Sequence, residues 1–194
     1  MSTRTNALAA SVAIGSLALS AQAAVDFGGP PEGFSVHETI AGTSASPANA
    51  SRWFDDGDGA VRTNWANERI TFHTSDLPTD TYMLGITAIN GGSLPLNQNY
   101  SHFKVDVKVN GAMLQSNAEI LASDTEWNTL WLALGEVSGE FDIELKWRND
   151  NYRAGHYDAN ITFGGIQLAG TAVPAPGAAA LAMCAIGVAS RRRR

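Results

Sequence analysis

The stretch that decides the fold is HFKVDVKVNG, residues 102–111. Phenylalanine and valine occupy every second position of it, and polar residues fill the positions between them. A period of two residues is that of a strand with one buried and one solvated face. Asn110 and Gly111 tolerate the positive φ angles of a two-residue turn. We therefore expect Val105 to Asn110 to pair with Ala112 to Ser116 in a β-hairpin.

The same alternation recurs along the chain. Phe141 to Trp147 and Tyr82 to Ala88 repeat it in full, and Ile70 with Phe72 gives a shorter version. Further strands are expected at Ser35 to Ile40, Asn128 to Leu134 and Ile161 to Leu168. Ala41 to Asn49 is expected to be a loop or a segment poor in strand, and Gly91 to Asn99 a second long loop.

Helical patterns are missing from the central sequence. Between Val25 and Ala172 no apolar stripe with a period of 3.6 residues is sustained. Strands follow one another at a spacing of roughly ten residues, which is typical of sandwiches. The sequence therefore predicts an all-β domain at 25–172, an antiparallel β-sandwich of jelly-roll type.

Residues 1–24 have the organisation of a signal peptide. Arg4 supplies a positive start, Ala7 to Leu19 is apolar, and Ala21-Gln22-Ala23 fits the small-x-small cleavage rule. We expect export with cleavage after Ala23 or Ala24. The alternative is a buried N-terminal helix, but Val25 to Pro31 reads as irregular chain.

The C-terminal residues 173–194 form a second targeting segment. Val173-Pro174-Ala175-Pro176 precedes the apolar run Gly177 to Ser190, and Arg191 to Arg194 end the chain. As a helix, the apolar run would be about 21 Å long, short of a hydrocarbon core of about 30 Å. The arginines would stay on the cytoplasmic side. We expect transient insertion into the inner membrane. A weak permanent anchor and a disordered basic tail are the alternatives.

This order of a proline motif, a short apolar helix and an arginine cluster resembles the PEP-CTERM sorting signal of Gram-negative-type bacteria. The resemblance covers Val173 to Arg194, and Ala175 stands where that family most often has Glu. It implies processing by an exosortase-type enzyme and a location at the cell surface or outside the cell. The residues that carry the signal are Val173, Pro174, Pro176, Arg191, Arg192, Arg193 and Arg194.

Composition narrows the possible partners. Arg4 and the four terminal arginines are five of the 13 basic residues, whereas none of the 19 acidic residues lies outside 25–172. The domain therefore has 8 basic against 19 acidic residues, a formal charge of −11. Such a surface repels nucleic acid and suits neutral partners or cations. The only cysteine, Cys184, lies in the C-terminal segment, so no disulfide within the chain is possible.

The loop from Asn149 to Asn160 is the best candidate site. It carries two carboxylates, Asp150 and Asp158, together with several amide oxygens. Hard oxygen ligands of this kind are those that Ca²⁺ takes in proteins. Because Asp and Asn are also common turn residues, a plain loop remains the alternative.

A second resemblance rests on this region. A strand ending in Trp-Arg-Asn-Asp at 147–150, a loop, Asp-Ala-Asn at 158–160 and a last strand with Phe163 and Ile166 resemble the C-terminal part of calcium-dependent carbohydrate-binding modules of the xylan-binding kind. The resemblance implies a galactose-binding-like jelly roll in which Ca²⁺ itself coordinates sugar hydroxyls. By position, Asp150 and Asp158 would be metal ligands, and Asn160 would orient the loop. His156 and Tyr157 depart from the family pattern.

Aromatic side chains bind sugars by packing against the apolar face of a pyranose ring. Tyr152 and Tyr157 are the first candidates, with Asn151 beside them as a polar contact. Trp147 falls on the apolar face of its strand and is expected in the core. Other aromatic residues in or near loops are Trp53, Trp65 and Trp127.

The acidic run Asp55 to Gly59 fails the EF-hand pattern, since Ala60 and Asn67 stand where ligands belong. A solvated turn is expected there, with a structural Ca²⁺ site as the alternative. Enzymatic motifs are also missing: the domain has no Gly-x-Ser-x-Gly, His-Glu-x-x-His or phosphate loop. Paired carboxylates, such as Asp150 with Asp158 or Asp58 with Glu68, could serve as acid and base of a hydrolase, but no sequence pattern fixes their geometry.

Together these observations predict an exported, non-catalytic β-sandwich that binds polysaccharide through a loop holding Ca²⁺. The second hypothesis is a structural protein of the extracellular matrix without a specific sugar site. A glycoside hydrolase is the third.

Overall fold

The computed structural model describes residues 24–171. The predicted signal peptide at 1–24, apart from Ala24, and the predicted sorting signal at 173–194 lie outside the described residues. Within the described range, no helix has the length and apolarity needed to span a membrane. Residues 24–31 have no regular secondary structure, which confirms the prediction of irregular chain there.

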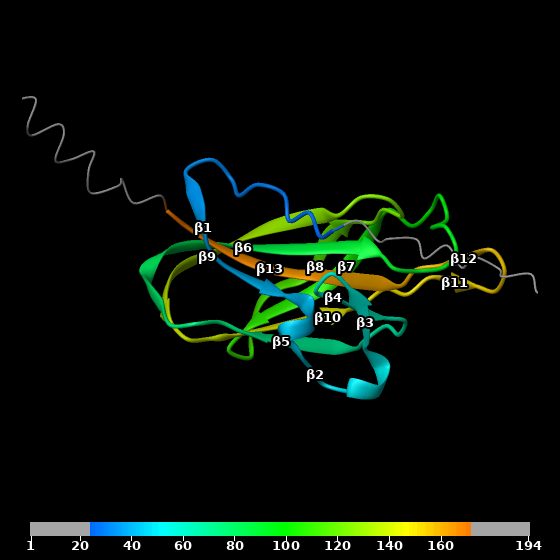
Figure 1. Cartoon of the computed structure of the whole chain (residues 1–194), viewed down its shortest axis with the longest axis horizontal. Coiled ribbons are helices and arrows are strands. Elements are labelled where there is room, and N and C mark those ends of the chain that lie inside the picture. Colours follow the sequence, from blue (N-terminus) through cyan, green and yellow to red (C-terminus); the bar gives the residue numbers. More distant parts are fainter. Residues whose placement is uncertain (1–23, 172–194) are drawn as a thin grey trace, which may run out of the picture.

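Antiparallel strands in this described part form two main sheets (Figure 1). The first has the order β3 (Phe54–Gly57), β4 (Ala60–Thr63), β13 (Ile161–Thr171), β6 (Leu77–Asn90) and β9 (Asn128–Gly139), and β1 (Phe34–Ala41) also pairs with β13. The second has the order β2 (Ser46–Pro47), β5 (Arg69–His73), β10 (Asp142–Trp147), β7 (His102–Val109) and β8 (Ala112–Leu121). A small separate sheet joins β11 (Tyr152–Arg153) and β12 (Tyr157–Asp158), and two short 3₁₀ turns are η1 (Gly42–Ser44) and η2 (Ala50–Arg52).

The core lies between the two main sheets, as the alternating pattern predicts. On β7, Phe103, Val105 and Val107 are fully buried, while Lys104 is exposed. One apolar cluster includes these residues and others from both sheets. Fully buried members from the remaining long strands are Ile70, Phe72, Tyr82, Leu84, Ile86, Ile143, Leu145, Trp147, Ile161, Phe163, Ile166 and Leu168. The all-β sandwich prediction is therefore confirmed.

The predicted hairpin at Asn110-Gly111 is also present. Asn110 has φ 47° and Gly111 φ 79°, and Val109 lies opposite Ala112. Register shifts further along the pair let β8 continue to Leu121, beyond the expected end at Ser116.

A bulge in β13 changes which of its residues face the core. Phe163 and Ile166 both face the core, and the register with β6 shifts between Phe163 and Gly165. Gly165 has φ 140°, and a Cβ there would lie 2.2 Å from the carbonyl oxygen of Ile40. The bulge therefore requires glycine where β13 pairs closely with the end of β1.

Candidate functional site

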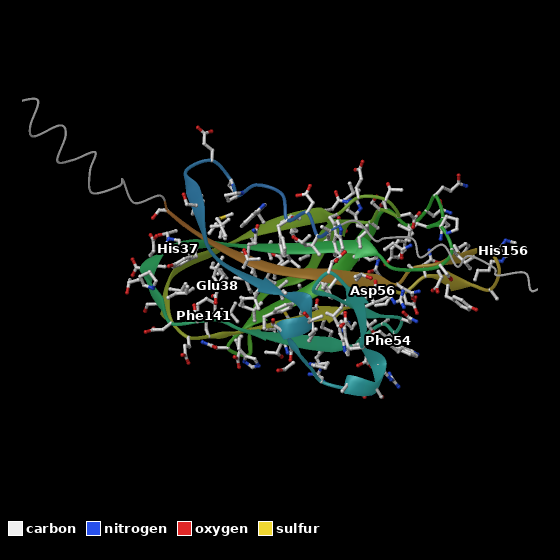
Figure 2. The ribbon with its side chains drawn as sticks, in the orientation of Figure 1. His37, Glu38, Phe54, Asp56, Phe141 and His156 are labelled. Carbon is white, nitrogen blue, oxygen red and sulfur yellow. The ribbon has the colours of Figure 1, made fainter. Side chains whose placement is uncertain are left out.

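A cleft lies at the end of the sandwich where β10 runs into the 149–160 loop. It has a volume of about 350 Å³ and is lined by Asn64, Trp65, Asp150, Tyr152 and Asp158. Three of the predicted site residues thus meet in one place, and the connection between β4 and β5 supplies the other two. The loop's outermost part, marked by His156, lies at the opposite end of the molecule from His37 and Glu38 (Figure 2).

The β11–β12 hairpin explains how the two carboxylates meet. Tyr152 pairs with Asp158, and Arg153 pairs with Tyr157. The Ala159 N–H donates a hydrogen bond to the carbonyl oxygen of Asn151 at 2.9 Å. This pairing folds the chain back on itself and returns Asp158 to the side of the cleft where the loop began.

The charges in the cleft repel one another. Burial raises the pKa of Asp150, a backbone hydrogen bond from Asn151 partly opposes the rise, and the Asp158 carboxylate raises the pKa further. The described groups around Asp150 therefore favour its neutral form relative to water. A cation between the two carboxylates would reverse that preference.

Asn160 lies beneath the loop and supports Asp158. Its side chain is only 4% exposed, and Nδ2 donates to Asp158 Oδ2 at 2.7 Å. Its backbone N–H donates to Asn90 Oδ1 at 2.9 Å, and Asn90 Nδ2 donates to Asp124 Oδ1 at 2.6 Å. Asp124 Oδ2 in turn accepts from the Leu96 N–H at 2.9 Å. This chain of hydrogen bonds connects three loops below the cleft.

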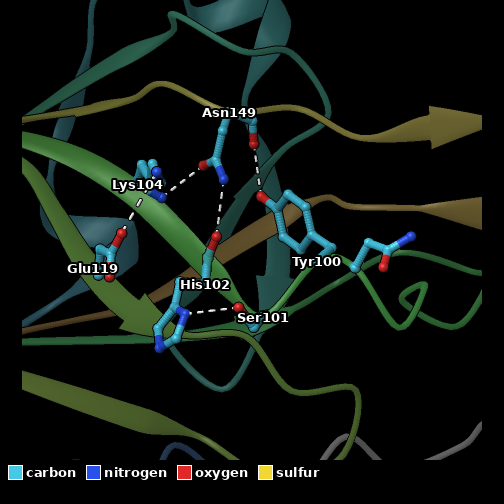
Figure 3. Close-up of a pocket in the computed structure, with 7 residues that line it drawn as sticks. Tyr100, Ser101, His102, Lys104, Glu119 and Asn149 are labelled. Carbon is cyan, nitrogen blue, oxygen red and sulfur yellow. Dashed lines mark hydrogen bonds and ion pairs between the residues drawn. The ribbon is translucent and has the colours of Figure 1, made fainter.

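Asn149 fixes the other end of the loop (Figure 3). Its Nδ2 donates to the carbonyl oxygen of His102 at 2.9 Å, and its Oδ1 accepts from the Lys104 N–H at 2.6 Å. The Tyr100 hydroxyl donates to the carbonyl oxygen of Asn149 at 2.6 Å, and burial raises the pKa of Tyr100, so the donor stays protonated. Asp150 therefore follows a residue whose position β7 determines.

Two exposed aromatic rings flank the carboxylates. Tyr152 is 63% exposed and Trp65 is 40% exposed. Phe54 packs against Trp65 with 5.9 Å between ring centroids, and the Arg52 guanidinium lies 5.8 Å from the Trp65 ring centroid. Arg52 and Phe54 thus hold the Trp65 ring in place while leaving part of it open to solvent.

The remaining predicted residues lie elsewhere. Tyr157 and Asn151 are half-buried and do not line the cleft, and Trp147 is fully buried in the core as expected. Only the end of the acidic run, Asp58 and Gly59, forms the β3–β4 turn, with Asp58 at φ 50°, whereas Asp55 to Gly57 belong to β3, so the turn prediction is correct for the last two residues alone. Asp56 is engaged there by Arg62 at 3.3 Å and by the Thr162 hydroxyl at 2.9 Å.

The oxygen atoms at the cleft suit a hard cation. Besides the two carboxylates, the side-chain oxygen of Asn64, which lines the cleft, is buried and accepts no hydrogen bond from the residues described, and the same holds for the side-chain oxygen of Asn160, which is hydrogen-bonded to Asp158 but does not line the cleft. Carboxylate and amide oxygens are the ligands that Ca²⁺ prefers. Among residues 24–171 no three His, Cys, Asp or Glu side chains gather as a metal group, so amide oxygens must complete any ligand set. With that contribution, the residues present fit Ca²⁺.

Sequence reasoning missed Asn64 and the fixing role of Asn149. Asn64 lies far from the 149–160 loop in sequence, and no local pattern connects the two. Asn149 was visible only as one more polar residue in a turn. The alternating pattern of β10 predicts that Asn149 follows the end of a strand. Its hydrogen-bond partners, however, are backbone groups of β7.

Comparisons with known proteins bear on the fold. No protein-family model matches the sequence, and no curated protein matches it. Among solved structures, the CBM36-1 domain of a multidomain xylanase from the hindgut metagenome of Trinervitermes trinervoides matches with a TM-score of 0.51 and 14% identity, over 70% of this chain and 98% of that one. A family 35 carbohydrate-binding module from Clostridium thermocellum matches with a TM-score of 0.46 and 13% identity, over 68% and 95% of the two chains. CBM35 from Paenibacillus barcinonensis matches with a TM-score of 0.47 and 14% identity, over 68% of this chain and 95% of that one. The first match shows that this chain shares the fold of the CBM36-1 domain.

Proposed function

We propose that residues 25–172 form a non-catalytic carbohydrate-binding domain whose cleft takes a polysaccharide. The observation that carries the proposal is the meeting of Asp150 and Asp158 with the exposed rings of Trp65 and Tyr152. Aromatic faces pack against the apolar side of a sugar ring, and carboxylates accept hydrogen bonds from its hydroxyls. An acidic surface also favours a neutral polymer over nucleic acid.

We further propose that Asp150 and Asp158 hold Ca²⁺, with the amide oxygens of Asn160 and Asn64 as additional ligands. The raised pKa of Asp150 and the two buried unpartnered amide oxygens support this assignment. When bound, the ion supplies positive charge and coordination positions that hydroxyl oxygens can occupy. Asn149 and Asn160 position the carboxylates from either end of the loop.

The fold supports the class of ligand. The matched structure belongs to a carbohydrate-binding module of a xylanase and is covered over 98% of its length. Xylan is therefore the first polysaccharide to test. One carboxylate pair considered for hydrolysis is Asp58 with Glu68. Arg52 forms an ion pair with Glu68 at 2.7 Å, so Glu68 is not free to act together with Asp58 on the β3–β4 turn.

Affinity electrophoresis tests the binding proposal. We expect the purified protein to be retarded in gels containing xylan or another neutral polysaccharide, with more retardation in Ca²⁺ than in chelator. Tyr152→Ala should reduce the retardation, whereas Met113→Ala, on exposed β8, should not. Equal mobility in every gel across a broad panel would overturn the proposal. Release of reducing sugar by the purified protein would favour a hydrolase instead.

We also propose that the chain is exported and sorted to the cell surface or released, after exosortase-type processing near Val173 to Pro176. The sequence patterns of residues 1–24 and 173–194 support it. Mass spectrometry of material from the producing cells should give a mature chain that begins near Val25 and ends near Pro174 to Pro176. Surface material that still contains Arg194 would contradict the processing step.

A further inference from the structure

Exposed aromatic side chains gather at one place on the domain. The three most exposed Phe, Trp and Tyr side chains of residues 24–171 are Tyr152 at 63%, Trp65 at 40% and Phe54 at 39%. Tyr152 and Trp65 line the cleft, and Phe54 packs against Trp65 with 5.9 Å between ring centroids and 33° between the ring planes. Phe54 is not part of the cleft lining. An exposed aromatic ring therefore borders the cleft from outside.

The start of β3 determines the direction of the Phe54 ring. The preceding residue, Trp53, has an extended backbone, is only 8% exposed and stacks on the buried Phe163 ring. Because successive side chains of an extended chain point to opposite faces, the burial of Trp53 turns Phe54 outward. Phe54 also pairs with Arg62 on β4, and Arg62 Nη1 donates to the carbonyl oxygen of Gly91 at 2.7 Å. The ring is therefore presented by a fixed strand rather than by a loop.

Trp65 has supports besides Phe54. Its backbone N–H donates to Thr63 Oγ1 at 3.3 Å, and the Arg52 guanidinium, which Glu68 holds at 2.7 Å, lies 5.8 Å from its ring centroid. A ring that served only to support Trp65 would gain nothing from its own exposure, because exposed apolar surface contributes no hydrophobic stabilisation. The open part of the Phe54 ring is therefore surface that a ligand can cover.

The size of the cleft indicates that a bound polymer extends beyond it. Its volume of about 350 Å³ is near the lower end of the range of about 300–1,000 Å³ for small-molecule sites, so a longer chain continues over the neighbouring surface. Phe54 is the next apolar ring there, and its 5.9 Å centroid distance from Trp65 is similar to the length of one sugar unit in an extended chain. Figure 2 shows Phe54 closer to His156 than to His37 along the molecule, in the half that carries the 149–160 loop.

We propose that the polysaccharide leaves the cleft across Phe54, so that the domain takes two or more consecutive neutral sugar units and the outer unit packs on the Phe54 ring. The choice of a sugar rests on the proposed function, whereas the exposure and the contacts of Phe54 do not. Because the cleft already holds the chain, the contact with Phe54 forms at a high effective concentration. The domain therefore prefers a polymer to a single sugar.

Titrations of the purified protein followed by ¹H–¹⁵N NMR, with the Trp65 indole N–H as reporter, test the proposal. The ligands are xylose, glucose and mannose, each with its β-1,4-linked dimer, trimer and tetramer. In the wild type we expect the affinity to rise about tenfold from the monosaccharide to the longer oligomers, the equivalent of one aromatic contact. Phe54→Leu keeps apolar packing against Trp65 but removes the ring face, so it should lose that rise and bind the monosaccharide unchanged. Phe54→Tyr should keep the rise.

The control is Leu121→Ala, which removes an exposed apolar side chain from β8 and should behave as the wild type. Equal losses for monosaccharide and oligomers in Phe54→Leu would overturn the inference, since Phe54 would then act only through Trp65. An affinity that does not rise with chain length in the wild type, or a rise that persists in Phe54→Leu, would overturn it and leave the cleft proposal standing. Absence of binding by every ligand would overturn both.

Discussion

Asp150 and Asp158 line one cleft from the two ends of the same loop, and the charge of Asp158 helps burial to raise the pKa of Asp150. The β11–β12 pairing and the Asn160 side chain hold them in this arrangement. A protein gains no stability from bringing like charges together. The arrangement supports the proposal that a bound cation compensates for this repulsion.

Asp150→Asn should raise stability in chelator and abolish stabilisation by Ca²⁺. Because the folded-state pKa of Asp150 lies above its ordinary value, the folded protein binds the proton more tightly, and stability falls as pH rises through the interval between the two values. The variant removes that loss, so its advantage should be absent well below the ordinary Asp pKa of about 3.9 and full at neutral pH. Thermal unfolding of both proteins, with Ca²⁺ and with chelator, at neutral pH and at a pH well below the ordinary Asp pKa, measures the difference in stability.

Asp76→Asn, an exposed aspartate away from the cleft, is the control for that experiment and should keep the response to Ca²⁺. A wild-type melting temperature that does not rise with Ca²⁺ would contradict the metal proposal, since a ligand of the native state must stabilise it by mass action.

Trp65→Ala should weaken polysaccharide binding with little effect on stability. Loss of a central aromatic contact costs about 2 kcal/mol of binding free energy, roughly thirtyfold in Kd. The ring is 40% exposed, so the free energy of unfolding should change by about 1 kcal/mol or less. Calorimetric titration with a soluble oligosaccharide and urea denaturation measure the two effects. An unchanged Kd would remove Trp65 from the site.

Asn149→Ala should destabilise the domain and weaken Ca²⁺ binding together. The substitution leaves the Lys104 N–H and the His102 carbonyl oxygen without their partner, at a cost of about 2 kcal/mol. It also frees the start of the loop that carries Asp150. Denaturation and Ca²⁺ titration report these effects, with Gln98→Ala, an exposed residue of the preceding loop, as the control. Full Ca²⁺ affinity in Asn149→Ala would show that the fixing role is unnecessary.

Gly165→Ala should be strongly destabilising, whereas Gly29→Ala should be close to neutral. The first combines φ 140° with a Cβ only 2.2 Å from the Ile40 carbonyl oxygen, while a Cβ on Gly29 meets no atom within 4 Å. Strain of this kind costs about 2 kcal/mol or more, because β1 must move away from β13. Equal stability of the two variants in urea would show that the bulge relaxes without loss.

Much of the fold could be predicted because strand signals are local. The alternation in β7 and β10 predicts which of their residues are buried, and Asn110-Gly111 predicts where the chain turns. The β3–β4 and β11–β12 pairs were not predicted as strands. All four strands are short, and apart from β4 (Ala60–Thr63) their residues are mostly polar or turn-forming, so the local pattern does not distinguish them from loops.

The candidate site was predicted only in part, for a physical reason seen at Tyr152 and Tyr157. In sequence the two tyrosines are equivalent, one on each side of the same loop. In the fold Tyr152 lies opposite Asp158 and lines the cleft, whereas Tyr157 lies opposite Arg153, one position along the strand. Neighbouring positions of a strand face opposite ways, so register decides which ring belongs to the cleft.

By itself, the sequence determined the sandwich, the central hairpin, the acidic loop and the two targeting patterns, since each depends on neighbours along the chain. Only the tertiary structure decided that Asn64 and Trp65 meet that loop and that Asn149 is fixed by β7. These contacts join segments far apart in sequence. They depend on how strands from two sheets are ordered and registered, which no local pattern encodes.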